Sequence, residues 1–323
     1  MSKIKKYFLL LILSFYPTII AADTIDQKIN SVLSPISNIV ASTVFYSVSF
    51  NESSFPIIVV WLIIAALFCT FYFGFVNIRH FNTALTFLSK KKEEPNAPGE
   101  VTHKQALWTA TAATVGLGNI AGVAIAVSLG GPGATFWMIL AGFLGMSLKF
   151  CECTLGVKYR VINSDGSVSG GPMYYLSRGL KELGYERTGK ILAILFAICC
   201  IGGSLGGGNM FQANQSFQQF LAITGGDASF FADRAWLYGL ILAILLGFVI
   251  IGGIKSIARV TEKLVPFMAI IYLLCALIII GINYTLIGQA FILIFQGAFT
   301  GEGVTGGIIG VLIQGFKRAA FSN

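Results

Sequence analysis

The sequence predicts an all-α polytopic membrane protein. Its 323 residues are 55% hydrophobic and 11% charged, whereas soluble domains carry about 25% charged residues. The mean hydropathy is +0.79. Apolar runs of about 20 residues, long enough to span a bilayer, alternate with short charged loops. This composition excludes a soluble domain. The net charge of +8 therefore reflects loops beside a membrane and not nucleic-acid binding.

The N-terminus combines a basic start with a short apolar stretch. Lysines near the first residue precede an apolar run from Tyr7 to Ile20, and two alanines follow it. This order is typical of a cleaved signal peptide over residues 1–22, with an uncleaved N-terminal anchor as the alternative. In either case residues 23–55 are predicted to be extracytoplasmic, and residues 56–323 to form the transmembrane domain.

Seven apolar segments are predicted to be membrane-spanning helices, at residues 56–76, 104–129, 133–157, 190–221, 236–254, 264–283 and 303–320. Basic residues gather in three loops between them, at 79–104, 158–190 and 255–263. Because Lys and Arg accumulate in cytoplasmic loops, these three loops are predicted to face the cytoplasm. The connections at 222–235 and 284–300 carry few positive charges and are predicted to lie on the outer side.

One apolar span contains the stretch TVGLGNIAG, from Thr114 to Gly122. Gly116, Gly118 and Gly122 make an unwound backbone easy. In lipid, unwound backbone survives only where it faces protein or water, and its open N–H and C=O groups can bind a carboxylate or a cation such as Na⁺. The alternative is close helix packing through the glycines spaced four apart. Asn119 favours a ligand site, because a mid-membrane amide needs a partner.

A second polar cluster lies in the span 190–221. Asn209, Gln212, Ser216 and Gln219 recur at three- and four-residue spacing, which predicts one face of a helix. A row of amides inside an apolar helix indicates a cavity lining or bonds to another helix. Glycines spaced four apart just upstream indicate a close packing face.

Charged residues inside the spans are scarce. Lys149 and Glu152 lie three residues apart near the predicted inner end of one span, which fits a salt pair or an inner gate. No Asp or Glu lies near the middle of the spans 104–129 and 190–221, and a proton relay needs such a group. Oxygen ligands without a buried acid favour Na⁺ as the coupling ion. No organic cofactor is expected, since the P-loop is absent and no strand precedes GLGNIAG.

Longer stretches closely resemble the alanine or glycine:cation symporter family. They are QALWTATAATVGLGNIAGVAIAVSLGGPGATFWM (105–138), GMSLKFCECTLGVKYR (145–160), GGPMYYLSRGL (170–180), GNMFQAN (208–214), GGIKSIARVTEKLVPFMA (252–269) and QGFKRAAFSN (314–323), and they cover most of the chain from residue 74 onward. The resemblance implies an amino-acid transporter fold of two inverted five-helix repeats. It also implies sodium-driven import of small neutral amino acids, chiefly alanine or glycine, across the cell (inner) membrane.

The resemblance also implies a substrate site. The family's first broken helix carries TxGxGN, its third core helix GNMxQxN, and its sixth core helix FSNEAG. The residues here that match these motifs or lie within them are Thr114, Gly116, Leu117, Gly118, Asn119, Gln212, Phe321, Ser322 and Asn323. The substrate carboxylate is expected on Thr114 and the N–H groups of Gly116 to Asn119. Its ammonium group is expected on Gln212 and the break at 321–323, and Na⁺ on carbonyl oxygens around Gly116.

The sequence stops within the FSNEAG motif. By resemblance it holds the first repeat, the start of the second, and an extra first span at 56–76, so it is expected to be a truncated symporter. A separate C-terminal half is then a candidate partner beside the amino acid and the lipid membrane. The alternative is a non-transporting membrane fragment. An integral-membrane enzyme is disfavoured, because no span carries a histidine, paired carboxylates, or a nucleophile with a base.

Overall fold

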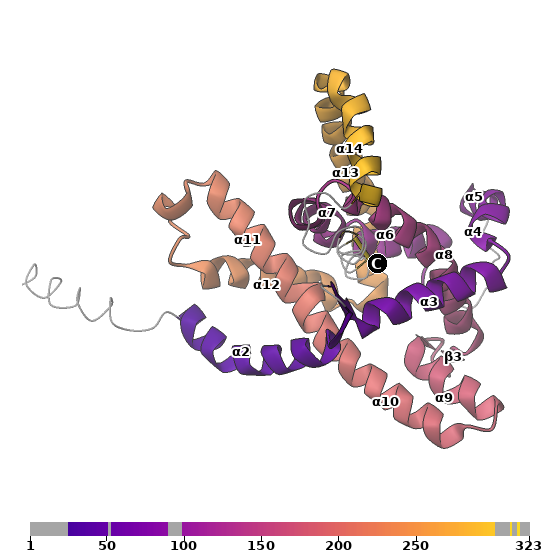
Figure 1. The fold of residues 1–323 in the computed structure, drawn as a ribbon. Coiled ribbons are helices and arrows are strands. Elements are labelled where there is room, and N and C mark those ends of the chain that lie inside the picture. The colour runs from indigo at the N-terminus through magenta and orange to yellow at the C-terminus, as the bar shows by residue number, and fades with distance from the viewer. Residues whose placement is uncertain (1–24, 51–52, 90–98, 301–310, 312–314, 317–323) are drawn as a thin grey trace, which may run out of the picture. The chain divides into compact units, whose positions relative to one another are not determined.

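A computed structural model describes residues 25–50, 53–89, 99–300, 311 and 315–316 (Figure 1). The chain divides into two units, Met1–Ser47 and Val48–Asn323. The predicted signal peptide or anchor at residues 1–22 lies outside the described residues. The division of the sequence at residues 22 and 55 therefore stays a prediction.

The first unit contributes helix α2 (Ile25–Val44), with Pro35 inside it. Apolar side chains of this helix such as Val32 and Ile39 are exposed. The helix falls within the segment 23–55, for which the charge pattern predicts an extracytoplasmic location.

The second unit is mostly helical. Its helices are α3 (Ile57–Tyr72), α4 (Val76–Arg79), α5 (Phe81–Ser89), α6 (His103–Thr114), α7 (Leu117–Gly130), α8 (Ala134–Lys158), α9 (Pro172–Glu182), α10 (Glu186–Gly203), the π-helical turn η1 (Ser204–Met210), α11 (Phe211–Ile223), the 3₁₀ turn η2 (Gly226–Ala228), α12 (Ala235–Ile250), α13 (Gly253–Ile282), the 3₁₀ turn η3 (Tyr284–Leu286) and α14 (Ile287–Thr300). Strand β1 (Ser47–Phe50) pairs with β2 (Ser53–Pro56), and β3 (Val161–Ile162) pairs with β4 (Val168–Ser169). The predicted all-α polytopic fold is confirmed, with two small hairpins added.

Four helical stretches in the described part of the chain are long and apolar enough to cross a membrane: His103–Gly130, Ala134–Lys158, Glu186–Ile223 and Gly253–Ile282. Shorter apolar helices are Ile57–Tyr72, Ala235–Ile250 and Tyr284–Thr300. Six of the seven predicted spans therefore correspond to apolar helices. The seventh, at 303–320, lies almost wholly outside the described residues.

The segment 284–300 was predicted as a connection, and this prediction was wrong. It forms η3 and α14, a continuous apolar helical stretch. Its apolar run is short, because Gly288 and Gln289 precede it and Gln296 and Gly297 follow it. A search for apolar runs of about 20 residues therefore misses this helix.

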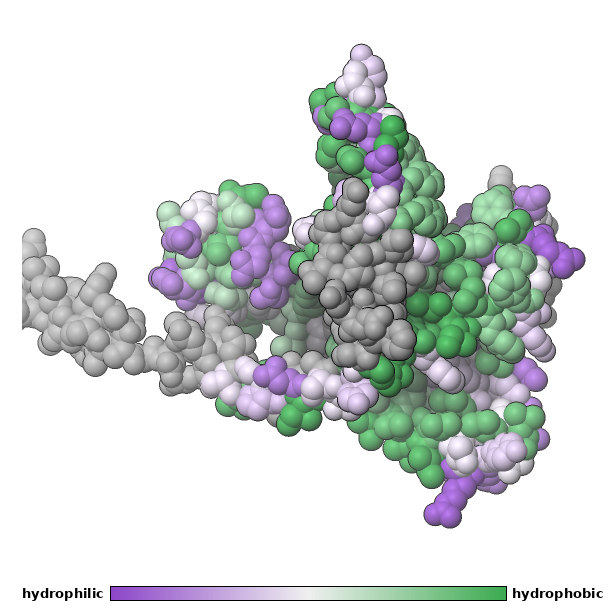
Figure 2. Space-filling view, in the orientation of Figure 1, coloured by the Kyte–Doolittle hydropathy of each residue, from purple (hydrophilic) through white to green (hydrophobic). Residues whose placement is uncertain are grey.

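Many large apolar side chains of the second unit are exposed, and Figure 2 shows hydrophobic residues over much of the visible surface of the helices. On α12, the exposed fraction is 77% for Phe248, and just past it 88% for Ile251. Such a surface is unsuited to water and is the surface that a lipid-facing helix presents. The protein is a multi-pass membrane protein.

Helix α3 packs against α8 through buried polar contacts. The Thr70 hydroxyl lies 2.7 Å from the Ala66 carbonyl of its own helix and 3.3 Å from the Leu144 carbonyl of α8. On the short helix α4 that follows, the partly buried Asn77 side-chain amide donates to the Phe143 carbonyl of α8 at 3.0 Å. Because Thr70 is fully buried, these bonds satisfy a hydroxyl that water cannot reach.

Helix α6 packs against α13 near the start of both helices. Gln105 Nε2 donates to Glu262 Oε2 at 3.1 Å, and the hydroxyls of Thr109 and Thr261 are 3.0 Å apart. Polar bonds of this kind hold helices together within a bilayer. They fix the position of α6, the helix that leads into the TVGLGNIAG stretch.

The N-terminus of α6 is closed by a capping box. The Thr102 hydroxyl accepts from the Gln105 N–H at 3.2 Å, and Gln105 Oε1 accepts from the Thr102 N–H at 3.1 Å. Two N–H groups that have no partner inside the helix are thereby satisfied. The capping box begins α6 at His103.

Replacing Thr102 with alanine is expected to lower the free energy of unfolding by about 1 kcal/mol, because the cap hydroxyl is lost. Unfolding in mixed detergent micelles measures the change. Thr154→Ala is the matched control, since the Thr154 side chain is exposed and its hydroxyl bonds the Phe150 carbonyl of its own helix. Equal losses from the two variants would contradict a capping role.

Candidate substrate site at the broken helix

The helix that carries TVGLGNIAG is interrupted, as predicted. Helix α6 ends at Thr114 and α7 begins at Leu117, with Gly116 extended between them (φ −110°, ψ −172°). Gly118 and Gly122 lie inside α7 and not in the break. Of the three glycines, one occupies the unwound stretch and two lie in regular helix.

Backbone groups on both sides of the break are bonded to nearby donors. The Gly116 carbonyl accepts from the N–H groups of Asn119 and Ile120, at 3.1 and 3.2 Å. The Asn119 side-chain amide donates to the Thr114 carbonyl, and the Thr114 hydroxyl bonds the Ala110 carbonyl at 3.0 Å. Asn119 thus has a partner within the chain, at the end of α6.

Gln212 reaches the break from α11. Its Oε1 accepts from the Leu117 N–H at 3.4 Å. A Cβ added at Gly116 would lie 3.9 Å from Gln212 Nε2, which is an ordinary van der Waals contact. The contact with Gln212 therefore does not require glycine at this position. The Leu117 N–H is the first of α7 and has no acceptor inside its own helix. The side-chain oxygen of Gln212 occupies the position at a helix N-terminus that favours a negative group.

The four polar residues of the predicted stripe do not converge on one place. Gln212 bonds α7, whereas the Ser216 hydroxyl lies 2.6 Å from the Tyr238 hydroxyl of α12. Asn209 and Gln219 are exposed. Asn209 lies in the π-helical turn η1, whose wider turn shifts its register relative to α11.

The glycines before this stripe were predicted to mark a close helix contact. A Cβ added at Gly202, Gly203 or Gly206 would meet no atom within 4 Å, so within the described part of the chain they face open space. The packing prediction therefore finds no contact among the described residues and stays a prediction. These glycines instead lie where α10 passes into η1, and π turns of this kind are frequent at functional sites.

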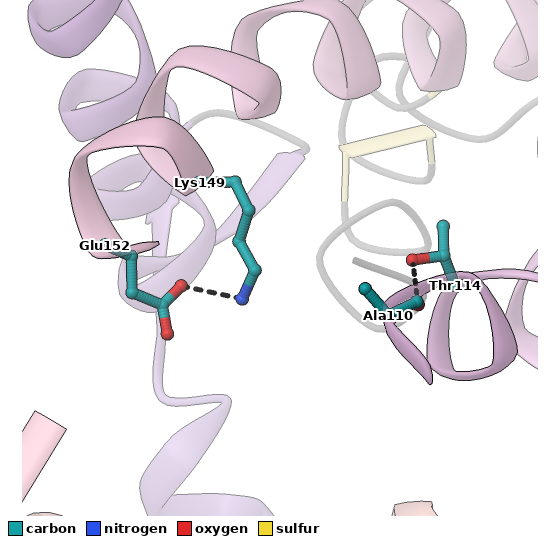
Figure 3. Close-up of polar contacts among 4 residues, drawn as sticks. All are labelled: Ala110, Thr114, Lys149 and Glu152. Atoms are coloured by element: carbon teal, nitrogen blue, oxygen red, sulfur yellow. Dashed lines mark hydrogen bonds and ion pairs between the residues drawn. The ribbon is translucent and has the colours of Figure 1, made fainter. Parts of the chain in front are cut away.

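Lys149 and Glu152 form the predicted ion pair. Lys149 Nζ and Glu152 Oε2 are 2.8 Å apart on α8, with side chains 62% and 41% exposed (Figure 3). Both line a cavity of about 460 Å³ whose walls also include Thr114 of α6 and residues of α3. The sequence did not predict this cavity, because it depends on the packing of α3 against α8.

The predicted sodium ligands can be compared with the backbone around Gly116. Its carbonyl oxygen is a suitable donor for a hard cation but already accepts two N–H groups. In the described residues no group of three or more His, Cys, Asp or Glu is placed to hold a metal ion. Phe321, Ser322 and Asn323 lie outside the described residues, so their role stays a prediction.

Comparison with known proteins identifies the family. Residues 38–323 match the Sodium:alanine symporter family. The chain is 42% identical over 269 residues to the sodium/alanine symporter AgcS of Methanococcus maripaludis, covering 83% of this chain and 57% of that protein. It is 38% identical to the putative sodium/proton-dependent alanine carrier protein YrbD of Bacillus subtilis, covering 77% of this chain and 48% of YrbD.

A third relative is the probable sodium/glutamine symporter GlnT of Bacillus subtilis, at 34% identity over 83% of this chain and 53% of GlnT. The chain spans about half the length of the curated relatives it matches. The family consists of membrane transporters and not of enzymes. The broken helix and its contact with Gln212 agree with this match. The chain belongs to the Sodium:alanine symporter family.

Proposed function

We propose that this chain acts in sodium-coupled import of alanine or glycine across the cytoplasmic membrane. The observation that carries the proposal is the contact between Gln212 Oε1 and the Leu117 N–H. It joins the two motifs from which the substrate site was predicted, although they are far apart in the sequence. The family match and the alanine named for two of the relatives support the choice of substrate.

In the proposed site the substrate carboxylate takes the place that Gln212 Oε1 now occupies on α7. The N–H groups from Gly116 to Asn119 and the Thr114 hydroxyl complete its contacts, because the N-terminus of a helix favours an anion. Gln212 Oε1, released from Leu117, then accepts a bond from the substrate ammonium group. Phe321 to Asn323 are proposed to complete this side of the pocket.

Sodium is proposed as the coupling ion, bound by carbonyl oxygens near Gly116. Helices α6, α7 and α11 carry no Asp or Glu, and their one histidine, His103, is the first residue of α6, at the opposite end from the break, whereas a proton relay needs such groups within the span. No organic cofactor takes part in this proposal. The preference for alanine or glycine over larger amino acids rests on the family resemblance, and one relative bears a name that specifies glutamine.

The alternative is that the chain is a non-transporting membrane fragment, or that it transports only with a separate C-terminal half. About half the length of each relative named above has no counterpart in this chain. Transporters of this type bind substrate between two repeats, which is why a separate half is proposed as the partner in this alternative.

Uptake of radiolabelled alanine into cells that express the chain tests the proposal. We expect accumulation in a sodium gradient, a fall to the level of empty-vector cells when choline replaces sodium, and competition by unlabelled glycine. Immunodetection in the membrane fraction controls for expression. Background uptake by a chain present in the membrane would favour the fragment, and sodium-independent uptake would contradict sodium coupling.

A further inference from the structure

The cavity beside the broken helix has the size of a ligand site. Its volume of about 460 Å³ lies in the range of roughly 300–1,000 Å³ that is typical of small-molecule pockets. Its walls are mainly apolar, and the small residues Ala66, Gly142 and Gly145 leave room inside it. Thr114, from the predicted substrate site, is part of the same lining.

The charge of this cavity comes from one pair of side chains. Among the described residues that line it, Lys149 and Glu152 are the charged ones. Figure 3 shows both of them on α8 and Thr114 on a separate helix, α6, and all three line the cavity. A ligand in this cavity therefore meets one ammonium group and one carboxylate that are neighbours on the same helix face.

We propose that Lys149 and Glu152 form a second binding position for a small zwitterionic amino acid, on the predicted cytoplasmic side of the broken helix. The identity of the ligand rests on the proposed function. The position receives the amino acid after it leaves the contacts with Leu117 and Gln212 and before it reaches the cytoplasm.

The chemistry of the pair matches a zwitterion. An amino acid carries a carboxylate and an ammonium group on the same carbon. Two side chains that are neighbours on one helix face can therefore reach both groups at once. The amino acid exchanges the 2.8 Å pair between Lys149 and Glu152 for two charge-assisted bonds, one to each side chain. A simple anion or cation pairs with one side chain and leaves the other without its partner.

The exposure of the pair suits transient binding. The side chains of Lys149 and Glu152 are 62% and 41% exposed, and an ion pair in contact with water contributes little to stability. A ligand can therefore separate the two groups at small cost. Its own bonds are weakened by the same water, so it binds loosely and leaves readily.

A matched ion pair elsewhere provides a control. Lys190 and Glu186 lie 2.9 Å apart, four residues apart on α10, with side chains 67% and 46% exposed. Neither is among the residues that line the cavity. This pair shares the chemistry and exposure of the proposed site without its enclosure.

Protection from thiol labelling tests the proposal. Met146 lines the cavity and is 49% exposed, so Met146→Cys in the full chain, with the six native cysteines replaced, reports on this space. The protein is held in lipid nanodiscs and labelled with a hydrophilic maleimide. When the alanine concentration is about ten times the dissociation constant of alanine for this position, the site is mostly occupied, and labelling is expected to be about tenfold slower. Acetate and methylammonium, which carry one charge each, are expected to have no such effect.

Charge variants decide whether the pair is responsible. In the Met146→Cys background, Lys149→Gln and Glu152→Gln are each expected to abolish protection. The exchanged variant Lys149→Glu/Glu152→Lys is expected to retain it, because a zwitterion can bind in the reverse orientation. Lys190→Gln is expected to leave protection unchanged. An introduced thiol that reacts with the maleimide but is not protected by alanine, or protection that survives both single variants, would overturn the proposal.

The proposal of a second position and the proposal of a substrate site at Leu117 and Gln212 can be tested separately. Gln212→Ala is expected to remove the contact to Leu117 and to leave the protection of the introduced thiol by alanine intact. Loss of protection in Gln212→Ala would assign the effect to the first site and overturn a second one. Protection without any uptake by the unaltered chain would support the second position and count against the proposed import.

Discussion

Replacing Gln212 with alanine is expected to lower sodium-dependent alanine uptake roughly five- to hundredfold. The substrate ammonium group then loses the side-chain oxygen that is proposed to receive it once Gln212 has left the Leu117 N–H. Leaving a polar group in a site without its partner costs up to about 1–3 kcal/mol, and about 1.4 kcal/mol corresponds to a tenfold change in binding. Initial rates of labelled uptake, over a range of alanine concentrations, measure the loss.

Two variants show whether this effect belongs to the site. Gln219→Ala changes an exposed glutamine on the same helix and is expected to transport like the unaltered chain. Gln212→Glu keeps an acceptor for Leu117 but places a negative charge where the carboxylate is proposed to bind, so it is also expected to lose uptake. Normal uptake by Gln212→Ala would remove this residue from the substrate site.

Replacing Gly133 with alanine is expected to destabilise the protein by about 1–3 kcal/mol or more, as overpacking does in a tight core. The added Cβ would lie 2.2 Å from the Gly297 carbonyl carbon and 2.3 Å from the Ala298 nitrogen. Both are backbone atoms, so no side chain can move aside. Helix α14 must then shift away from α8.

The measurement is the unfolding midpoint in detergent, followed by intrinsic fluorescence. Trp137 reports on this contact, because its indole N–H donates to the Ala298 carbonyl at 3.2 Å. Gly156→Ala is the control on the same helix, since its Cβ would meet no atom within 4 Å. It is expected to be neutral or slightly stabilising because alanine favours helix. Similar midpoints for both variants would show that α14 does not pack on Gly133 in the membrane protein.

The sequence was informative where one local property decides the structure. Length and hydropathy located the membrane helices, because a span requires a long apolar run. The run of glycines located the break in TVGLGNIAG to within a few residues. Even so, periodicity could not tell which glycine unwinds, since Gly116, Gly118 and Gly122 have the same chemistry.

The features that the sequence did not reveal depend on partners far away along the chain or on backbone geometry. The cavity beside Lys149 lies between α3 and α8, where Thr70 of α3 and Asn77 of α4 bond carbonyl groups of α8 that are 74 and 66 residues away in the sequence. The bond from Asn119 to Thr114 depends on how far the backbone bends at the break. The turn η1 closes its hydrogen bonds over one more residue than an α-helix does, and no residue type signals this.

Two backbone oxygens beside the broken helix can each serve either a donor of the chain or a cation. The Thr114 carbonyl accepts from the Asn119 amide, and the Gly116 carbonyl accepts from two N–H groups in the first turn of α7. A cation that approaches either oxygen competes with these donors. Displacing the two N–H groups from the Gly116 carbonyl would open the first turn of α7, whereas displacing the Asn119 amide from the Thr114 carbonyl would break only a side-chain bond. If Na⁺ binds there as proposed, its occupancy is therefore linked to the length of α7, whose first turn closes on the same Gly116 carbonyl oxygen.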